Sequence, residues 1–273
     1  MSKKPLTRDE QFLAKAAGDD VPMPKPLTRV QEFLERIVER LSGSVTEETL
    51  INAIAPLNAS IAQLNRKTIQ FRHGKGTFTA TASGTNVVWQ YGGQKAQGSN
   101  CTFDVKSDNG LICMDFDSIT SLSIQKDAKN KMNLSDLGGK ITNLLKLNNC
   151  TNITGDLSDL GGKITNLLNL YNCPNITGDL SDLGGKITSL LGLYNCSNIT
   201  GVYSGTKYPK NINISKTSVT PADMDANLIN FAASGVKSGT FTATGMKRTA
   251  ASDDAVATLV ANGWTVSGLT KEG

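Results

Sequence analysis

A Gly-Gly-Lys tripeptide recurs three times in the chain, in "NLSDLGGKIT" at 133–142 and in "DLSDLGGKIT" at 156–165 and 179–188. A phosphate-binding loop needs a further glycine five residues before the Gly-Lys pair and a hydroxyl residue directly after the lysine. Here Leu157 stands five residues before Gly162, and Ile164 follows Lys163. The tripeptide is therefore predicted to be a tight turn, because glycine tolerates positive φ.

The other residues that carry chemistry do not form a recognisable catalytic or metal site. His73 is the one histidine in the chain, and it is expected at a solvent-facing turn. Cys150, Cys173 and Cys196 are spaced by 23 residues, and thiols stacked in this way lack the tetrahedral geometry of a zinc site. The aspartates of "SDNG" and "DFDS" do not have the spacing of a calcium loop. We therefore expect no metal, no cofactor and no enzymatic activity.

The cysteines favour a reducing compartment. One lone cysteine per repeated unit is not typical of a disulfide framework, so Cys150, Cys173 and Cys196 are predicted to be buried thiols. Cys101 and Cys113 could approach each other across a hairpin. Two reduced cysteines are the preferred interpretation, and a disulfide between them is the alternative.

Binding is the more plausible chemistry. In a strand, residues that alternate with inward leucines point outward. The candidate receptor-binding face consists of Lys146, Asn148, Asn169, Tyr171 and Tyr194. Tyrosine and asparagine can stack on and hydrogen-bond to sugars or to a protein surface. The alternative is a solvated face without a ligand.

These residues lie in three tandem copies of a 23-residue unit over 133–201. A period of 20–29 residues with L-x-L-x-x-C is typical of leucine-rich-repeat-like solenoids. The inward positions are Leu145, Leu147, Cys150 and Ile153, then Leu168, Leu170, Cys173 and Ile176, then Leu191, Leu193, Cys196 and Ile199. Degenerate flanking layers are expected at 119–124 and 211–220. The "NIT" sequence of each layer is expected to contribute turn and asparagine-ladder residues, not glycan sites.

The first 42 residues contain a duplicated motif, "KPLTRDEQFLAKAAG" and "KPLTRVQEFLERIVERLSG". In each copy a threonine and an acidic or amide residue three positions later form a capping box, which predicts two short amphipathic helices. Their apolar stripes need each other, as in a helical hairpin, or a partner, as in a docking peptide. The candidate attachment residues are Leu6, Phe12, Leu13, Leu27, Phe33, Leu34 and Ile37.

The remaining segments complete the expected organisation. Residues 43–67 are predicted to form a helix or short coiled coil, because Leu50, Ile54, Leu57, Ile61 and Leu64 form a heptad seam; a helix packed on the next domain explains that seam equally well. Short alternating runs over 68–124 predict a small β-sandwich around Trp89. Residues 220–273 are predicted to form an α/β C-terminal cap, and 125–219 the solenoid. The expected fold class is mixed α+β, multidomain and elongated.

Composition agrees with an extended protein. Hydrophobic residues make up 38% and aromatic residues 5% of 273 residues, and such a lean content suits several small cores. The net charge is +4 without a long basic run, so nucleic acid is not an expected partner. No apolar run is long enough to span a membrane, and no signal peptide precedes the first helix, so synthesis in the cytoplasm is expected.

Three features together resemble proteins of tailed bacteriophages. The "KPLTR…FL" start resembles N-terminal segments of virion-associated proteins, and "LxLxxCxNITGDLSDL" resembles the repeat region of phage tail-fibre and receptor-binding proteins. The ending "TLVANGWTVSG" resembles the unit that often closes such repeats. The resemblance implies a tail or head fibre located in the virion, made in the host cytoplasm.

The same resemblance implies how such a fibre would be used. Residues 1–42 would attach to other virion proteins, and 133–201 would present a face to a host surface glycan or protein. Phage fibres are usually trimers, whereas the seam over 50–64 favours two strands, so the expected homo-oligomer is a trimer or a dimer. The alternatives are a structural decoration or adaptor protein of the virion, and a bacterial surface adhesin, which the absence of an export signal disfavours.

Overall fold

The computed structural model describes residues 67–272, which lie in one compact unit. The predicted helices over 1–42 and over most of 43–67 fall outside the described residues. The same holds for the candidate attachment residues Leu6, Phe12, Leu13, Leu27, Phe33, Leu34 and Ile37.

The described part begins with two antiparallel arrangements of strands that face each other. The strands are β1 (Lys67–His73), β2 (Gly76–Thr85), β3 (Val88–Tyr91), β4 (Gln94–Gln97), β5 (Asn100–Val105), β6 (Gly110–Phe116) and β7 (Ser118–Ser123). One sheet has the order β1-β6-β3-β4, whereas β7, β2 and β5 end a second, nine-stranded sheet. The rings of Phe71 and Phe78, one from each sheet, lie 5.7 Å apart, and Phe71 stacks on Trp89 at 5.9 Å. Trp89 is fully buried, as predicted.

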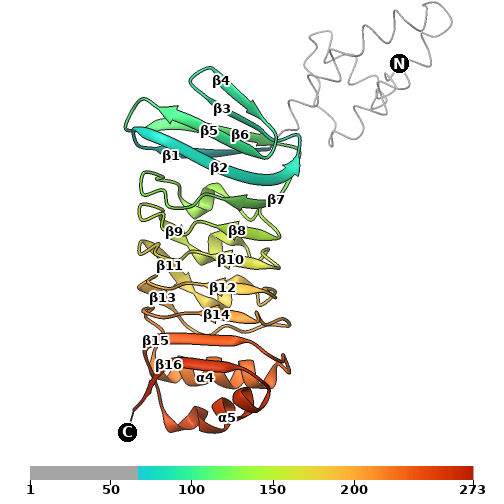
Figure 1. Cartoon of the computed structure of the whole chain (residues 1–273), viewed down its shortest axis with the longest axis vertical. Coiled ribbons are helices and arrows are strands. Elements are labelled where there is room, and N and C mark those ends of the chain that lie inside the picture. Colours follow the sequence, from blue (N-terminus) through green and yellow to red (C-terminus); the bar gives the residue numbers. More distant parts are fainter. Residues whose placement is uncertain (1–66, 273) are drawn as a thin grey trace, which may run out of the picture. The chain divides into compact units, whose positions relative to one another are not determined.

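From β7 onward the nine-stranded sheet is parallel, and each layer of the chain adds one strand. The strands are β8 (Leu144–Lys146), β10 (Leu167–Asn169), β12 (Leu190–Gly192), β14 (Asn211–Asn213), β15 (Thr240–Arg248) and β16 (Thr265–Lys271). Leu145 pairs with Leu168, and Leu168 with Leu191, so β8, β10 and β12 are offset from one another by one 23-residue unit. Identical side chains therefore stack on one another, and Figure 1 shows the strands as successive rungs.

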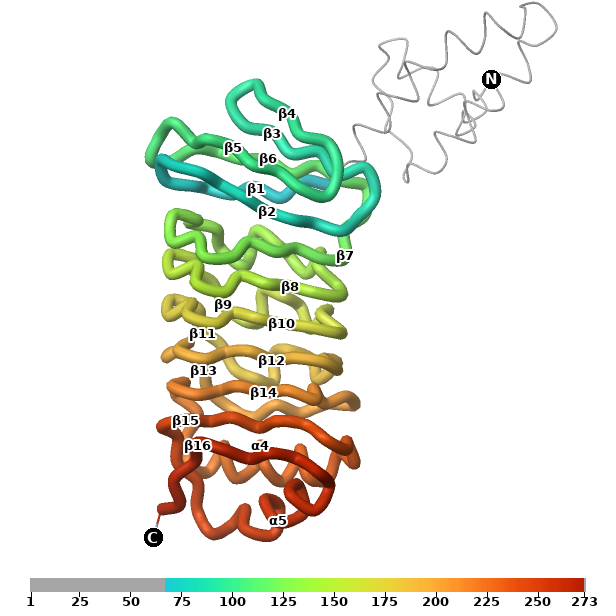
Figure 2. The backbone as a smooth tube through the Cα atoms, in the orientation of Figure 1, coloured from blue at the N-terminus to red at the C-terminus, as the bar shows by residue number. Residues whose placement is uncertain are grey.

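The return path of each layer builds the opposite side. It contains β9 (Gly155–Asp156), β11 (Ile176–Asp179) and β13 (Asn198–Thr200), which form a three-stranded parallel sheet. It also contains one 3₁₀ helix per unit: η1 (Leu134–Asp136), η2 (Leu157–Leu160) and η3 (Leu180–Leu183), each started by a capping box. The inward leucines, cysteines and isoleucines of the three units are buried, which confirms the predicted burial. Figure 2 follows the backbone as it passes from one layer to the next.

The Gly-Gly turns allow the layers to approach each other. Gly161 and Gly162 have φ of 59° and 56°, in the left-handed region, as predicted for a tight turn. Gly185 has φ of 53°, and a Cβ atom placed on it would lie only 2.2 Å from the Cα atom of Gly205 in the next layer. A side chain at this position would therefore separate two layers.

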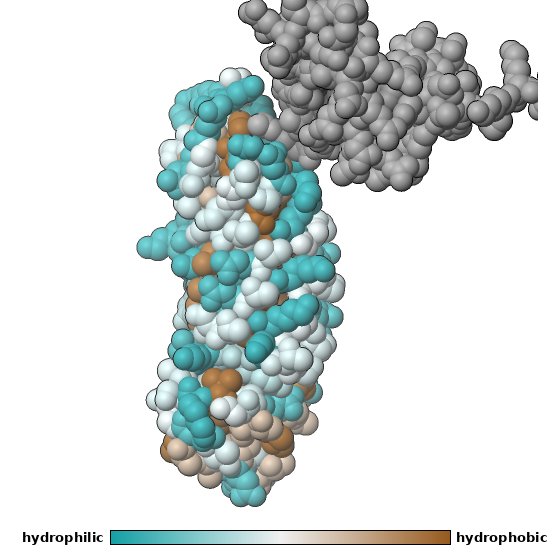
Figure 3. Space-filling view, turned by 90° about the vertical axis from the view of Figure 1, so that its right-hand side faces the viewer, coloured by the Kyte–Doolittle hydropathy of each residue, from teal (hydrophilic) through white to brown (hydrophobic). Residues whose placement is uncertain are grey.

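Two α-helices close the C-terminal end. The helix α4 (Pro221–Ala233) begins at Thr220, whose side chain accepts a hydrogen bond from the Asp223 amide. The 3₁₀ helix η4 (Ala250–Ser252) leads into α5 (Asp253–Ala261). Phe231 of α4 meets the rings of Phe241 and Trp264 at 5.3 and 5.8 Å, and these contacts join the helices to the sheet. Figure 3 shows that, on the side it presents, apolar surface gathers at this end of the stack.

The structure corrects the expected fold class. Residues 67–272 are mostly β, with sixteen strands in three sheets and two α-helices, so a mixed α+β class is wrong. The expected arrangement of a separate sandwich, a leucine-rich-repeat-like solenoid and an α/β cap is overturned as well, because one nine-stranded sheet runs from β5 to β16. The edge strands of a parallel stack have unpaired amides and carbonyls. Here β7, β2 and β5 on one side and β14, β15 and β16 on the other continue the sheet beyond the repeat strands.

Candidate functional site

The outer face of the parallel sheet brings the predicted receptor-binding residues together. We define the outer face as three columns of side chains on β8, β10, β12 and the residues just after them. The columns are Leu144, Leu167 and Leu190; Lys146, Asn169 and Gly192; and Asn148, Tyr171 and Tyr194. The strand register places the members of the first two columns side by side. Backbone hydrogen bonds from Asn149 to Tyr171 and from Asn172 to Tyr194 align the third.

The two tyrosines stack on each other. Their ring centroids are 4.5 Å apart and the ring planes meet at 17°. Lys216 Nζ lies 5.1 Å from the centroid of the Tyr194 ring, and it comes from the β14 layer, on the side opposite Tyr171. Both faces of Tyr194 are thus occupied, so its ring edge and hydroxyl are what it offers to a ligand. Face-on stacking of a sugar, which the sequence suggested for both tyrosines, is therefore blocked at Tyr194, and at Tyr171 the neighbouring position of the same column is held by Asn148.

The middle column is arranged around a glycine. Asn169 Oδ1 accepts a hydrogen bond of 3.1 Å from the Tyr171 amide. A Cβ atom on Gly192 would lie 3.1 Å from that oxygen, so glycine leaves space for the Asn169 side chain. In the first layer, Asn148 Oδ1 is buried and has no hydrogen-bond partner among the described residues. A covered acceptor of this kind is commonly satisfied by an ordered water.

An asparagine ladder fixes the turn that follows the outer face. Asn149, Asn172 and Asn195 have φ of 60°, 58° and 59°. Asn172 donates to Asn149 Oδ1 at 2.8 Å, and Asn195 donates to Asn172 Oδ1 at 3.0 Å. Asparagine tolerates the left-handed region better than most residues. The ladder therefore combines a local backbone preference with contacts between layers.

The "NIT" asparagines form a second ladder, as predicted. Asn175 Nδ2 donates to the Thr151 carbonyl and Asn198 Nδ2 to the Pro174 carbonyl, both at 2.8 Å. Asn152 makes the equivalent bond to Ala128. Each side chain thus satisfies a backbone acceptor of the preceding layer.

The cysteine column is structural. Cys173 and Cys196 are fully buried, and their thiols donate to the carbonyls of Leu147 and Leu170 at 2.9 Å. Burial raises the pKa of Cys173 to about 12, which leaves the thiol protonated and unreactive. All five cysteines are free, and Cys101 and Cys113 lie on β5 and β6, in different sheets.

His73 is not at a solvent-facing turn, so that expectation is wrong. It is fully buried at the end of β1, and its Nε2 lies 3.0 Å from both carboxylate oxygens of Asp127. Its ring meets Phe78 edge-on at 5.4 Å. His73 Nδ1 has no partner among the described residues. The pair therefore lacks the hydrogen-bonded nucleophile of a catalytic triad.

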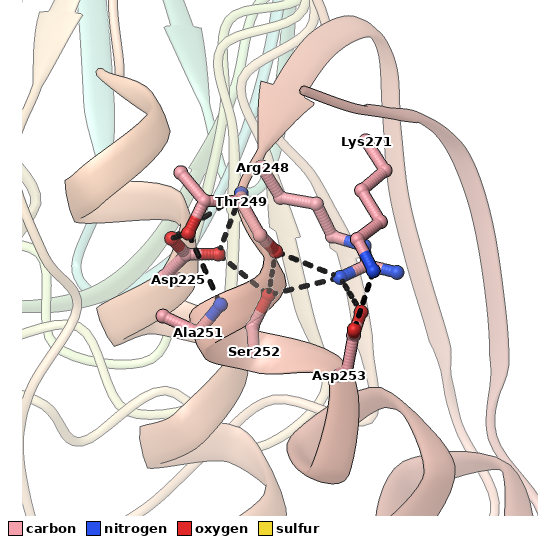
Figure 4. Close-up of polar contacts among 7 residues, drawn as sticks. All are labelled: Asp225, Arg248, Thr249, Ala251, Ser252, Asp253 and Lys271. Carbon is pink, nitrogen blue, oxygen red and sulfur yellow. Dashed lines mark hydrogen bonds and ion pairs between the residues drawn. The ribbon is translucent and has the colours of Figure 1, made fainter. Parts of the chain in front are cut away.

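The densest polar cluster joins the two C-terminal helices (Figure 4). The Asp225 carboxylate of α4 accepts hydrogen bonds from the Thr249 amide at 3.0 Å, the Thr249 hydroxyl at 2.6 Å and the Ser252 hydroxyl at 2.5 Å. Arg248 Nη1 donates to Asp253 Oδ1 at 2.6 Å. Every carboxylate in this cluster has a partner within the fold, so the arrangement indicates a structural role.

Two further searches of residues 67–272 give negative results. No group of three or more His, Cys, Asp or Glu side chains there is placed to hold a metal ion. In the same range, the helices are too short or too polar to cross a membrane.

The sequence analysis did not predict that a column of leucines belongs to the outer face. Leu144, Leu167 and Leu190 are half-buried, and each directly precedes a buried leucine. The adjacent leucine pairs in the sequence could have indicated this column. Adjacent residues of a strand point to opposite faces, so one leucine of each pair must point outward.

Comparison with known proteins yields no relative. No protein-family model matches the sequence, and neither a curated protein nor a solved structure is similar to it.

Proposed function

We propose that this chain is a fibre protein of a tailed bacteriophage, attached to the virion through its N-terminal segment and binding the host-cell surface through the outer face. The resemblance of the "KPLTR…FL" start and of the repeat unit to phage proteins supports this proposal. The proposal assigns no catalytic step to the chain, and the virion is its expected location.

The observation that carries the proposal is the composition of the outer face. Three half-buried leucines stand beside two stacked tyrosines and the side-chain amides of Asn148 and Asn169. Aromatic residues are enriched and charged residues depleted at the centres of protein interfaces. In the three repeat layers Lys146 is the one charged residue of this face. The face suits a host-surface protein or glycan bound through ring edges, amides and methyl groups.

Adsorption tests the proposal directly. Purified protein should coat host cells and compete with phage for adsorption. Leu190→Lys places a charge in the leucine column of the outer face and should weaken cell binding at least tenfold, because the charge would lose its hydration in a complex. Ser181→Lys, which adds the same charge at an exposed position of η3 in the same unit, is the matched control and should bind like the wild type.

The alternatives give other results. If the wild type neither coats cells nor competes with phage, the receptor-binding role is wrong. A structural decoration or adaptor would lose its incorporation into particles when residues 1–42 are deleted, while Tyr171→Ala and Tyr194→Ala would leave infection unchanged. Cross-linking of the purified chain distinguishes the trimer from the dimer.

A further inference from the structure

A column of lysines runs across the layers at the Gly-Gly turns. Leu144, Leu167, Leu190 and Asn211 are paired in register along β8, β10, β12 and β14. Four residues before each of them stands a lysine. The lysine column consists of Lys140, Lys163, Lys186 and Lys207. The Lys207 amide donates to the Gly185 carbonyl at 2.9 Å, which places Lys207 beside the turn that holds Lys186.

The charges of the lysine column are not used within the described fold. Lys163, Lys186 and Lys207 are exposed and Lys140 is partly exposed. Among residues 67–272, the ion pairs of lysine and arginine involve Lys106, Lys247, Arg248 and Lys271, and none involves the lysine column. Lys140 Nζ donates to a backbone carbonyl, that of Asp136, at 3.2 Å.

The nearest carboxylates in sequence serve another purpose. Asp159 and Asp182 stand four residues before Lys163 and Lys186. Their Oδ2 atoms accept hydrogen bonds from the cap amides of η2 and η3 at 3.0 and 3.2 Å. Neither forms an ion pair with a lysine of the column. The turn itself is fixed by glycine conformation and these capping boxes, so the lysine charges are not required to form it.

The spacing of the column suits an extended polymer. Adjacent strands of a sheet lie about 4.8 Å apart, so the lysines offer about one positive charge per layer along the stack. Like charges at this distance repel one another, and an anionic chain lying along the column would relieve that repulsion. A ligand with one negative charge per sugar or per pair of sugars has a comparable linear charge density.

The residues beside the lysines favour a polysaccharide over a nucleic acid. Thr165 and Thr188 are exposed, and their hydroxyls donate to the carbonyls of Thr142 and Thr165 at 3.0 and 3.1 Å. The threonine oxygens therefore remain acceptors for ligand hydroxyl groups. Sequence-independent binding of single strands relies on aromatic stacking platforms, whereas the positions flanking each lysine in the repeat units are glycine, buried isoleucine and threonine.

We propose that the lysine column is a binding site for an extended anionic polysaccharide that lies across the layers. This site is separate from the outer face and does not depend on the function proposed above. Its chemistry requires carboxylate or sulfate groups on the polymer and no covalent step.

Fluorescence anisotropy with the full chain tests the site. The probes are labelled heparin for sulfate, labelled alginate for carboxylate, labelled dextran as a neutral polymer, and labelled poly(dT) and polyphosphate as phosphate polymers. The wild type should bind heparin or alginate more tightly than the phosphate polymers and should not bind dextran. The combined variant Lys140→Gln, Lys163→Gln, Lys186→Gln and Lys207→Gln should bind with a weaker salt dependence. With about 0.7 per contact, the value for single-stranded nucleic acids, the magnitude of the slope of log affinity against log salt should fall by roughly 3.

The matched control removes four exposed lysines elsewhere, by Lys67→Gln, Lys75→Gln, Lys95→Gln and Lys106→Gln. This control should change the slope by less than the value of one contact, about 0.7. Equal losses in both variants would show non-specific charge attraction and overturn the site. Tighter binding of poly(dT) or polyphosphate would overturn the polysaccharide assignment, and so would no binding of heparin and alginate. If the fourfold variant does not fold, the four single variants should each lower the slope by roughly 0.7.

Discussion

Asn149, Asn172 and Asn195 show how a single residue type holds the layers together. Each has a positive φ at the end of its strand, and each is linked to its neighbour by a side-chain amide. The same column continues with Lys126 and Lys216, whose φ values are 56° and 57°. The left-handed turn is thus a property of the layer, and the hydrogen-bonded ladder is the addition made by asparagine in the three repeat units.

Two substitutions at Asn172 separate these contributions. Asn172→Gly keeps the backbone conformation and removes hydrogen bonds to two neighbours, so it should lower the free energy of unfolding by about 1–2 kcal/mol. Asn172→Ala removes the same hydrogen bonds but, unlike glycine, keeps a Cβ atom in the left-handed region without the polar side chain that lets asparagine tolerate it, so it should cost about 1 kcal/mol more than Asn172→Gly. Urea denaturation measures both. Equal stabilities of the two variants would show that the conformation of this turn contributes nothing.

At the scale of elements, one carboxylate connects α4 to the segment that starts α5. Asp225 is 5% exposed and accepts hydrogen bonds from Thr249 and Ser252. Burial acts to raise the pKa of Asp225, but the hydrogen bonds from Ser252 and Thr249 outweigh it, and the pKa lies below its ordinary value. The ionised carboxylate is therefore the form that stabilises the contact between the helices.

Asp225→Asn should lower the free energy of unfolding by about 2 kcal/mol near pH 7, because hydrogen bonds to a charged acceptor are lost. A lowered pKa in the folded state adds stability above the unfolded value, about 3.9, and this stability is lost as the pH falls through the folded value. The difference between wild type and variant should therefore shrink below about pH 4. Asp254→Asn, at an exposed position of α5, is the control and should change stability little at any pH. A difference that grows towards acid pH contradicts this assignment.

At the scale of the whole described unit, the in-register stack makes one repeat removable. Deleting residues 156–178 joins Gly155 to Asp179 and would let β8 pair with β12 in the register that β10 now uses. In layered proteins each repeat contacts only its neighbours. The shortened chain should therefore fold cooperatively, with a melting temperature lower by roughly 5 °C.

Deleting residues 156–166 removes half a unit and is the control for that experiment. It breaks the alignment of leucine with leucine and should abolish the cooperative transition in circular dichroism and calorimetry. If both deletions unfold, or both fold equally well, the layers are not interchangeable units.

The residues that build the layers were largely predictable from sequence, whereas the site was only partly so. The 23-residue spacing identified the buried leucines, cysteines and isoleucines, because an apolar side chain at a fixed place in every unit has the same neighbours in every layer. The five predicted outer-face residues do lie together. The sequence analysis expected the tyrosines to stack on a ligand, but the rings of adjacent layers stack on each other, with their centroids 4.5 Å apart.

The sequence by itself determined which side chains point inward, where the glycine turns fall and where α4 begins, because these depend on contacts and backbone preferences within one unit or one turn. Tertiary structure alone decided that a nine-stranded sheet joins the expected modules, that His73 is buried against Asp127, and that lysines 23 or 21 residues apart form one column. Strand pairing, burial and charge clustering depend on residues far apart in the chain. No local pattern specifies which of these residues will meet.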